Sequence, residues 1–325
     1  MNSKIKGSIF GGAIGDALGY QIEFKRNIKD KEVTRFKNIG IISDDTQMTL
    51  YTAEGLLYAN LNNIPYEDAV YYFYREWLNG QNGFTNPNSK TWLSYIPNLN
   101  IPRAPGNTCI DALSSGKMGT IRNPLNNSKG CGTVMRIAPV GLFIKDTRDA
   151  GIVAAKVAAI THGHQQGLIS SYVLAIIINL IVYDGLNIHD ALNKSLEYLS
   201  HEKDLFSKKD VKDFLKLIEK TIYLSNKDYN DIDAIFELGE GWVADEALAI
   251  ALYSCLKYEK SYEDAIVCAI NHDGDSDSTG AIAGNIIGAY LGIENIPDYY
   301  LQNIELYDVI DKVADELINY SVKSL

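Results

Sequence analysis

Apolar residues recur at helical spacing along almost the whole chain, and this recurrence limits the possible folds more than any other feature. In several long segments the apolar positions follow i, i+3, i+4 and i+7, the pattern of a helix with one buried face. Sustained two-residue alternation is hard to find, and strands do not alternate with helices. The sequence therefore predicts an all-α fold with roughly a dozen helices of ordinary length in one compact body. The segments with this spacing are QMTLYTAEGLLYANL, YEDAVYYFYREWL, AGIVAAKVAAITH, VADEALAIALYSCL, YEDAIVCAI and NIELYDVIDKVADELINY.

Glycines at four-residue spacing mark one helix as central. Gly280, Gly284 and Gly288 in STGAIAGNIIGAYLG line one helix face. Each glycine costs a helix interior about 1 kcal/mol relative to alanine, and a chain tolerates that cost where another backbone must approach closely. We therefore expect this helix to be buried in the middle of the molecule. The glycine-rich segment GGAIGDALGYQIEF near the N-terminus is expected to be closely packed as well.

Three aspartates precede the central helix in the segment HDGDSDSTG. Asp273, Asp275 and Asp277 alternate along the chain, and carboxylates this close repel one another unless a cation lies between them. They match positions 1, 3 and 5 of an EF-hand loop, but that loop also needs glycine at position 6 and glutamate at position 12. This chain has Ser278 and Gly284 there, which excludes an EF-hand. A buried helix would carry the aspartates into the protein, which favours a cation site over a solvated surface cluster.

A second acidic group lies far away in the sequence. Ser43, Asp44 and Asp45 open a helix expected to start near Gln47, where serine or one aspartate would serve as an ordinary N-cap. Two adjacent aspartates exceed that need, and Glu23 adds a further acid. All-oxygen ligands suit Mg²⁺ or Mn²⁺, and this number of charges suits two ions rather than one. The set comprises the carboxylates of Glu23, Asp44, Asp45, Asp275 and Asp277, with the hydroxyls of Ser43 and Ser278 as partners.

Charge and cysteine content argue against several classes of function. The chain carries 41 Asp and Glu against 30 Lys and Arg, a net charge of −11. With no basic run, we expect neither non-specific nucleic-acid binding nor attachment to a membrane. Cys109, Cys131, Cys255 and Cys268 lie far apart without a CxxC pair. This spacing indicates reduced thiols and a cytoplasmic protein rather than a zinc knuckle or a disulfide framework.

Two apolar stretches need a separate interpretation. Asp16 interrupts the N-terminal one, which is therefore not expected to be a signal peptide. The most apolar segment, GLISSYVLAIIINLIVY, contains serine and asparagine and falls short of the roughly 20 apolar residues of a membrane span. It is expected to be a buried core helix.

The acidic segments belong to a longer series of sequence blocks. In order along the chain, the blocks are GAIGDALGYQIEF, SDDTQMTL, SKGCGTVMRIAPVGL, ITHGHQQG, GWVADEAL and GDSDSTGAIAGNIIGAYLG. This ordered series resembles the ADP-ribosylglycohydrolase family, which includes the dinitrogenase reductase-activating glycohydrolase and the vertebrate ADP-ribosyl-acceptor hydrolases. The resemblance spans almost the whole chain. It implies an all-α fold with a binuclear Mg²⁺ or Mn²⁺ centre that holds the distal ribose of an ADP-ribosyl group.

The resemblance implies a ligand set and two candidate catalytic acids. Many family members have threonine where this chain has Ser43 and Ser278; serine keeps the oxygen and loses the methyl group, so coordination survives with less rigidity. Glu23 or Asp45 is the carboxylate expected to take or position the proton of the attacking water. Ligands this far apart in sequence must converge, so residues 1–325 are expected to form one domain. The implied metal ligands are Glu23, Ser43, Asp44, Asp45, Asp275, Asp277 and Ser278.

The resemblance also implies a diphosphate-binding segment in NNSKGCGTVMR. Backbone N–H groups of a glycine-rich turn hold phosphate without net charge. Here Ser128, Gly130 and Gly132 would do so, with Lys129 adding a positive charge. Cys131 stands where the family often has asparagine and is not expected to be a nucleophile.

Two further residues are implied to contact the ligand. His162 in ITHGHQQG is expected to touch the ADP-ribose, with simple packing as the alternative, and His164 has no assigned role. Trp242 in GEGWVA aligns with an aromatic position near the family's active site and is expected to stack on the ligand. GEGWVA also mimics the dinucleotide motif GxGxxA, but no strand is expected before it. Residues 103–109, RAPGNTC, resemble the family without an assigned role.

The implied reaction is metal-assisted hydrolysis of the glycosidic bond at C1 of the distal ribose, which releases ADP-ribose. ADP-ribosyl-arginine on a protein is the default substrate, while ADP-ribosyl-serine, nucleic-acid-linked ADP-ribose and a small metabolite remain open. The alternative is a catalytically silent ADP-ribose-binding or structural relative, since the family contains lens crystallins. The intact acidic set favours the enzyme, because a silent protein has no need for five clustered carboxylates.

Overall fold

A computed structural model of the chain describes residues 1–25 and 32–323. Over these residues the backbone forms α-helices, short 3₁₀ turns, a π-helical turn at Leu180–Asp184 and two isolated β-bridges, with no strand. The predicted all-α fold is confirmed. The last of the predicted segments becomes helical only at Tyr307, four residues later than its apolar spacing indicated. The helices are α1 Asn2–Gly19, α2 Asp44–Asn62, α3 Tyr66–Gln81, α4 Asn107–Ser114, α5 Ala138–Phe143, α6 Thr147–Ala159, α7 Gln165–Asn179, α8 Ile188–His201, α9 Lys208–Ser225, α10 Asp231–Leu238, α11 Ala244–Lys257, α12 Tyr262–Ile270, α13 Ser276–Leu291, α14 Asp298–Leu301 and α15 Tyr307–Lys323.

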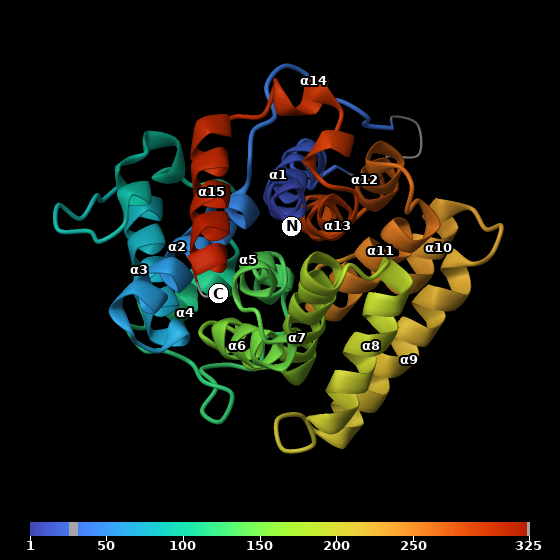
Figure 1. Cartoon of the computed structure of the whole chain (residues 1–325), viewed down its shortest axis with the longest axis horizontal. Coiled ribbons are helices and arrows are strands. Elements are labelled where there is room, and N and C mark those ends of the chain that lie inside the picture. Colours follow the sequence, from blue (N-terminus) through green and yellow to red (C-terminus); the bar gives the residue numbers. More distant parts are fainter. Residues whose placement is uncertain (26–31, 324–325) are drawn as a thin grey trace.

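Helices α1 and α13 lie side by side at the centre of the molecule (Figure 1), and they contact each other more extensively than any other described pair. A Cβ atom added to Gly284 would lie 2.0 Å from the carbonyl oxygen of Gly11, and one added to Gly15 would lie 2.0 Å from that of Gly280. Both distances are far inside van der Waals contact, so no larger residue fits while the backbones pass this closely. The predicted close approach is confirmed, and its partner is the other glycine-rich segment.

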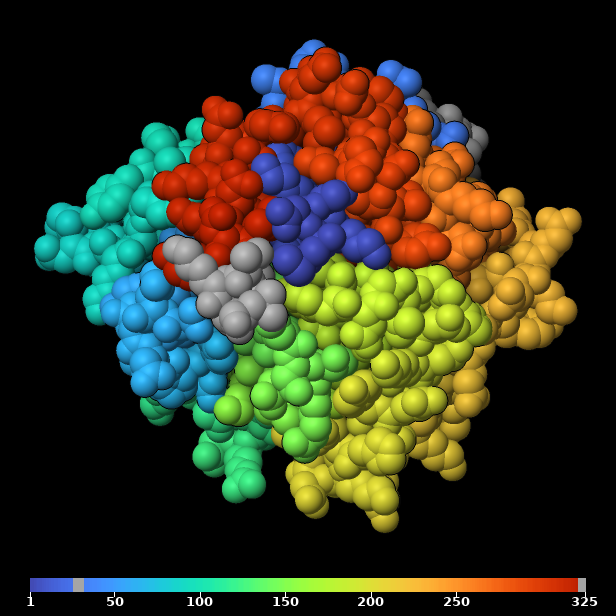
Figure 2. Space-filling view, in the orientation of Figure 1, coloured from blue at the N-terminus to red at the C-terminus, as the bar shows by residue number. Residues whose placement is uncertain are grey.

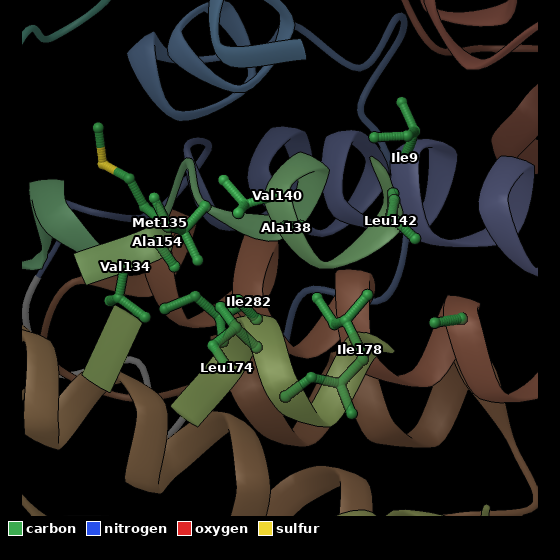
Figure 3. Close-up of a cluster of buried hydrophobic side chains, with 14 of the residues drawn as sticks. Ile9, Val134, Met135, Ala138, Val140, Leu142, Ala154, Leu174, Ile178 and Ile282 are labelled. Carbon is green, nitrogen blue, oxygen red and sulfur yellow. The ribbon is translucent and has the colours of Figure 1, made fainter. Parts of the chain in front are cut away.

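The main hydrophobic core surrounds this pair and includes α7. In Figure 3, Val134 and Val140 lie above Leu174 and Ile178 of α7, close to Ile282 of α13. The stretch Gln165–Asp184 is long and apolar enough to cross a membrane by length and composition, but 94% of its most apolar window is buried inside the structure. The predicted buried core helix is therefore confirmed.

The two ends of the chain are part of the same body. Figure 2 shows the N-terminal residues reaching the surface between the C-terminal helices and α8. Lys6 of α1 pairs with Asp311 and Asp315 of α15, with N–O distances of 2.6 and 2.9 Å. A smaller apolar cluster lies among α9, α10, α11 and α12. The described residues thus form a single all-α domain.

Candidate metal and ligand site

Three of the predicted metal ligands meet where α1 ends and α13 begins. Glu23 lies in the turn after α1, while Asp275 and Asp277 lie at the start of α13. One carboxylate oxygen from each lies within 4.8 Å of the other two, and all three side chains are buried. The tight helix pairing places them there, because a Cβ atom on Gly19 would lie only 2.1 Å from the carbonyl oxygen of Ser276.

The second acidic segment forms the start of α2. Ser43 is the N-cap, and its hydroxyl accepts a hydrogen bond from the N–H of Asp45 at 3.2 Å. The helix therefore begins at Asp44 rather than near Gln47, and neither aspartate is needed as the cap. Asp44 accepts a hydrogen bond from the N–H of Gly106 at 3.2 Å. The Oδ2 atom of Asp45 is buried without a hydrogen-bond partner.

Burial and mutual repulsion raise the pKa values throughout this group. Burial raises the pKa of Glu23 to about 10, and the charges of Asp277 and Asp275 add to the effect. The pKa values of Asp44 and Asp45 lie well above the usual value, because both are buried and both face Asp277. The two acidic segments therefore share one electrostatic environment. A bound cation would favour the ionised form of these acids.

Asp16, which the sequence interpretation missed, holds the second acidic segment in place. It is fully buried in α1. Its carboxylate accepts hydrogen bonds from the N–H of Ser43 at 3.0 Å, from the N–H of Thr46 at 3.1 Å and from the Thr46 hydroxyl. Burial and the charge of Asp277 raise the pKa of Asp16 to about 7. One feature of the sequence could have identified Asp16: it is an acid inside a glycine-rich apolar helix. A carboxylate buried in this way must find hydrogen-bond donors.

Residues 103–109 also support the second acidic segment. The carbonyl of Arg103 accepts a hydrogen bond from the N–H of Asp44 at 2.9 Å, next to the bond from Gly106. The guanidinium of Arg103 pairs with Glu305 at 3.5 Å. This segment therefore helps to position Asp44 through its backbone, a role that its sequence alone did not indicate.

Cys131 and Ser278 border the acidic centre. The thiol of Cys131 donates a hydrogen bond to Asp275 at 2.7 Å. Burial and the neighbouring Asp275 raise the pKa of that thiol well above its usual value, so Cys131 stays protonated and is unsuited to nucleophilic attack. The N–H of Ser278 donates to Asp277 at 3.0 Å, and its side chain hydrogen-bonds with Asp275.

The segment expected to hold a diphosphate is fixed against the Trp242 loop. The N–H of Cys131 donates to the carbonyl of Trp242 at 3.2 Å, and the N–H of Gly130 donates to the hydroxyl of Ser128 at 3.3 Å. Two of its amides are thus used within the protein, and a ligand oxygen at Gly130 would have to displace that hydroxyl. Lys129 forms an ion pair at 3.6 Å with an acid in α11.

His162 packs beneath this segment. A Cβ atom on Gly132 would lie 3.0 Å from its ring. The ring Nδ1 is 2.8 Å from the hydroxyl of Thr161, which accepts a hydrogen bond from Arg136 at 2.6 Å. Burial, aided by the positive charge of Arg136, lowers the pKa of His162 to about 3, so the ring is neutral at pH 7. His164 is the N-cap of α7 and accepts a hydrogen bond from a helix N–H through Nδ1.

Trp242 lies between the 128–132 segment and a cavity of about 740 Å³ beside Glu23. Its backbone carbonyl accepts the hydrogen bond from Cys131, while its indole stacks with Phe24, another residue of the cavity lining, at a centroid distance of 6.5 Å. The indole N–H donates to Glu240 at 3.1 Å. The GEGWVA motif follows helix α10 rather than a strand, as expected.

Two unpartnered oxygens make the acidic group suitable for a divalent cation. Glu23 Oε2 and Asp45 Oδ2 are buried without a hydrogen-bond partner. A buried carboxylate oxygen left unpaired is costly, whereas Mg²⁺ and similar hard cations prefer oxygen ligands. The residues present therefore fit a cation held by Glu23, Asp275 and Asp277, with the acids of α2 close by.

Comparison with known proteins matches residues 1–324 to the family model described as ADP-ribosylglycohydrolase. The protein named ADP-ribosylhydrolase ARH3 from Gallus gallus is 26% identical over 58% of this chain and only 57% of its own length. The ADP-ribosylarginine hydrolase Tri1 of Pseudomonas putida (strain GB-1) is 24% identical over 97% of this chain and 78% of its own. A solved structure titled "ADP-ribosylglycohydrolase-related protein complex" shares the fold, with a TM-score of 0.71, 23% identity and 98% coverage of both chains. The chain belongs to the ADP-ribosylglycohydrolase family.

Proposed function

We propose that this protein is a metal-dependent hydrolase that removes ADP-ribose from an ADP-ribosylated protein, with arginine as the default acceptor. The observation that carries the proposal is the convergence of Glu23, Asp275 and Asp277 on one buried point, with the Asp45 carboxylate close by. Family membership supports the substrate class. One of the relatives is named as an ADP-ribosylarginine hydrolase, which supports arginine as the default.

The proposed cofactor is a pair of Mg²⁺ or Mn²⁺ ions. When bound, such ions would supply Lewis-acid chemistry that helps to orient the ribose and to activate water. The acids of α2 lie close enough to Asp277 to share in raising the group's pKa values, which supports their membership of the same centre. The proposed ligands are Glu23, Ser43, Asp44, Asp45, Asp275, Asp277 and Ser278.

The carboxylates of this chain also take part in the chemistry. Water attacks C1 of the distal ribose, and Glu23 or Asp45 accepts its proton, because each has a buried oxygen that no protein donor occupies. Positive charge develops on the ribose ring as the bond to the acceptor breaks, and the neighbouring carboxylates stabilise it. The acceptor leaves with the proton, and ADP-ribose is the product.

The rest of the ADP-ribose is proposed to extend from the centre along residues 128–132 towards His162. His162 is neutral at pH 7 and buried under that segment, which suits a hydrogen-bonding or packing contact. Trp242 is proposed to face the scissile end of the ligand. The four cysteines are free, which supports a cytoplasmic setting.

The test is a panel of acceptors linked to ADP-ribose through arginine, through serine, through a nucleic-acid end and through a small metabolite. Free ADP-ribose is measured after incubation with Mg²⁺, with Mn²⁺ or with EDTA. We expect release from the arginine-linked protein with either metal and none with EDTA. Binding of ADP-ribose without release from any acceptor would instead support the catalytically silent alternative.

A further inference from the structure

We propose that the cavity beside Glu23 binds the acceptor protein, and that its occupant is a positively charged stretch of chain next to the modified residue. This inference rests on the proposed function and adds where, and by what chemistry, the acceptor is recognised. The cavity has a volume of about 740 Å³, and Glu23 is the lining residue that it shares with the acidic centre.

Aromatic side chains stand exposed around this cavity. Phe24 is 73% exposed, Phe236 is 81% exposed and Trp242 is 41% exposed, and all three line it. Large apolar side chains gathered on a surface mark a binding site more often than chance. The faces of aromatic rings also attract cations, arginine above all. These rings therefore suit a chain that carries guanidinium or ammonium groups.

The same walls are acidic. Besides Glu23, the lining includes Asp233, Glu240 and Asp273. Lys25 is the one lysine or arginine among the described residues of the lining, and its ammonium group donates to the backbone carbonyl of Gln21. His272 also lines the cavity, but burial lowers its pKa to about 4, so its ring is neutral at pH 7. With a net charge of −11 on the whole chain, the field at the cavity attracts cations and repels phosphates.

A second cavity extends the acidic surface along α10. Its volume is about 390 Å³, and it shares Ile232, Ile235 and Asn271 with the first. Its lining includes Asp264 and Asp231, of which Asp231 is already paired with Lys257 at 2.6 Å. Helix α10 is 8 residues long, so the two cavities lie along about 12 Å of helix. An extended chain of about four residues has the same length. The surface fits a short peptide segment rather than one side chain.

The two cavities together form a groove along α10. Trp242 lies between this groove and the proposed path of the ADP-ribose. The N–H of Cys131 donates to the backbone carbonyl of Trp242, whereas the indole stacks with Phe24 and donates to Glu240, both of which line the cavity. A ligand that spans the acidic centre would therefore leave its nucleotide beside residues 128–132 and its acceptor beside Trp242 and Phe24. The bond to be broken lies between these two regions, next to Glu23.

The experiment compares two peptides that carry ADP-ribose on the same arginine. One has lysine and arginine on both sides of that residue, and the other has glutamine at those positions. Because each exposed charge pair contributes a factor of about two to five, the full-length protein should show about tenfold higher kcat/KM for the basic peptide, mainly through KM. The preference should fall as salt is raised. Trp242 fluorescence should also change on titration with the basic peptide lacking ADP-ribose.

Variants test whether the preference for the basic peptide depends on the groove or on the surface charge of the whole protein. Asp233→Asn and Phe236→Ala should each reduce the preference for the basic peptide about two- to fivefold. Asp213→Asn, which removes another exposed carboxylate, on α9 and outside both cavities, should leave the preference unchanged. Equal kcat/KM for the two peptides, an unaltered preference in Asp233→Asn, or better hydrolysis of an ADP-ribosylated oligonucleotide would each overturn the inference.

Failure of the proposed function would give a different result. In that case no substrate would release ADP-ribose, while the unmodified basic peptide would still change the fluorescence of Trp242, and the groove assignment would stand on that binding. Normal ADP-ribose release combined with no peptide binding and no charge preference would overturn the groove assignment alone.

Discussion

Asp16 and Asp277 lie in one buried group of charges but have different roles. Asp277 has its carboxylate within 4.8 Å of those of Glu23 and Asp275. Asp16 accepts hydrogen bonds with both of its oxygens, Oδ1 from the N–H of Ser43 and Oδ2 from the N–H of Thr46. The first arrangement suits the proposed role of a cation ligand, and the second anchors the start of α2, which carries further proposed ligands. Substitution by asparagine separates the two roles, because it removes the charge and keeps the shape.

For Asp277→Asn we expect a metal-free protein at least as stable as the wild type, because a buried negative charge among like charges is lost. The rise in thermal midpoint that Mg²⁺ causes in the wild type should disappear, since a cation stabilises only the state that binds it. The measurement is the thermal midpoint of both proteins with EDTA and with Mg²⁺. An equal Mg²⁺-induced rise in both proteins would show that Asp277 is not a ligand.

For Asp16→Asn we expect the opposite pattern in the absence of metal. Asparagine offers one acceptor oxygen in place of two and directs an N–H group at backbone donors, so unfolding should become easier by about 1–3 kcal/mol. Mg²⁺ should still stabilise the variant, but with lower affinity. Urea denaturation of the metal-free proteins followed by Mg²⁺ titration makes the comparison. If Asp16→Asn were as stable as the wild type without metal, its anchoring role would be wrong.

At the level of residues, the proximity of acids could be predicted where charge and spacing are visible in the sequence. Asp275 and Asp277 stand two positions apart where a helix begins, and the structure brings both to Glu23. The role of Asp16 could not be predicted, because it depends on hydrogen-bond donors from another helix that no local sequence pattern reveals. The proposed binding role of Phe24 and Phe236 could not be predicted for a related reason. Exposed aromatic residues indicate a binding site only when the fold brings them together around one cavity.

At the scale of elements, the close pairing of α1 and α13 determines where the acids lie. Glycines on both helices allow the two backbones to pass so closely that an added Cβ atom would meet a carbonyl oxygen of the other helix. This contact places the end of α1 beside the start of α13. The four-residue glycine spacing was sufficient to predict a buried helix with a close neighbour. The spacing could not identify the neighbour. The sequence contains a second glycine-rich segment, but no rule of spacing shows that the two segments pack against each other.

Gly284→Ala tests this pairing. The new methyl group would lie 2.0 Å from the carbonyl oxygen of Gly11, so the helices must separate, and we expect a loss of about 1–3 kcal/mol in the free energy of unfolding. Gly106→Ala is the matched control, because nothing lies within 4 Å of its added methyl group; a change below about 1 kcal/mol is expected there. Urea denaturation of both variants gives the answer. Similar losses in the two would mean that the α1–α13 contact is looser than described.

For the whole molecule, the buried acids predict an unusual dependence of stability on pH. The folded-state pKa values of Glu23 (about 10) and Asp16 (about 7) lie above the ordinary 4.5 and 3.8. Their stabilising contribution is therefore complete below pH 4 and is lost as the pH rises through 7 towards 10. The pKa of His162 is lowered to about 3, so its contribution is lost as the pH falls below about 6.5. The acids dominate above pH 7.

In EDTA we therefore expect the thermal midpoint to fall between pH 7 and pH 9. With saturating Mg²⁺ the fall should be smaller or absent, because the cation binds the ionised carboxylates and its affinity rises with pH. Thermal midpoints at half-unit pH intervals, with and without Mg²⁺, provide the test. Parallel pH profiles under the two conditions would contradict a cation centre built from these acids.

The single body also explains why the site is assembled from distant parts of the sequence. Lys6 ties α1 to α15 through Asp311 and Asp315, so both ends of the chain support the helix pair that carries the acids. The sequence predicted convergence from the number of acids and from family resemblance. It did not predict the groove along α10, because a cavity depends on the relative placement of helices and not on the composition of any one of them.

The most direct test is the number of Mn²⁺ ions bound per chain, measured by electron paramagnetic resonance of free Mn²⁺ during titration of the metal-free protein. If the acids of α2 and α13 form one centre with Glu23, the wild type should bind two ions, and Asp277→Asn should bind fewer than two under the same conditions. The Asp213→Asn control should match the wild type. A wild-type protein that binds no Mn²⁺, or that binds the same number of ions as Asp277→Asn, would contradict the account.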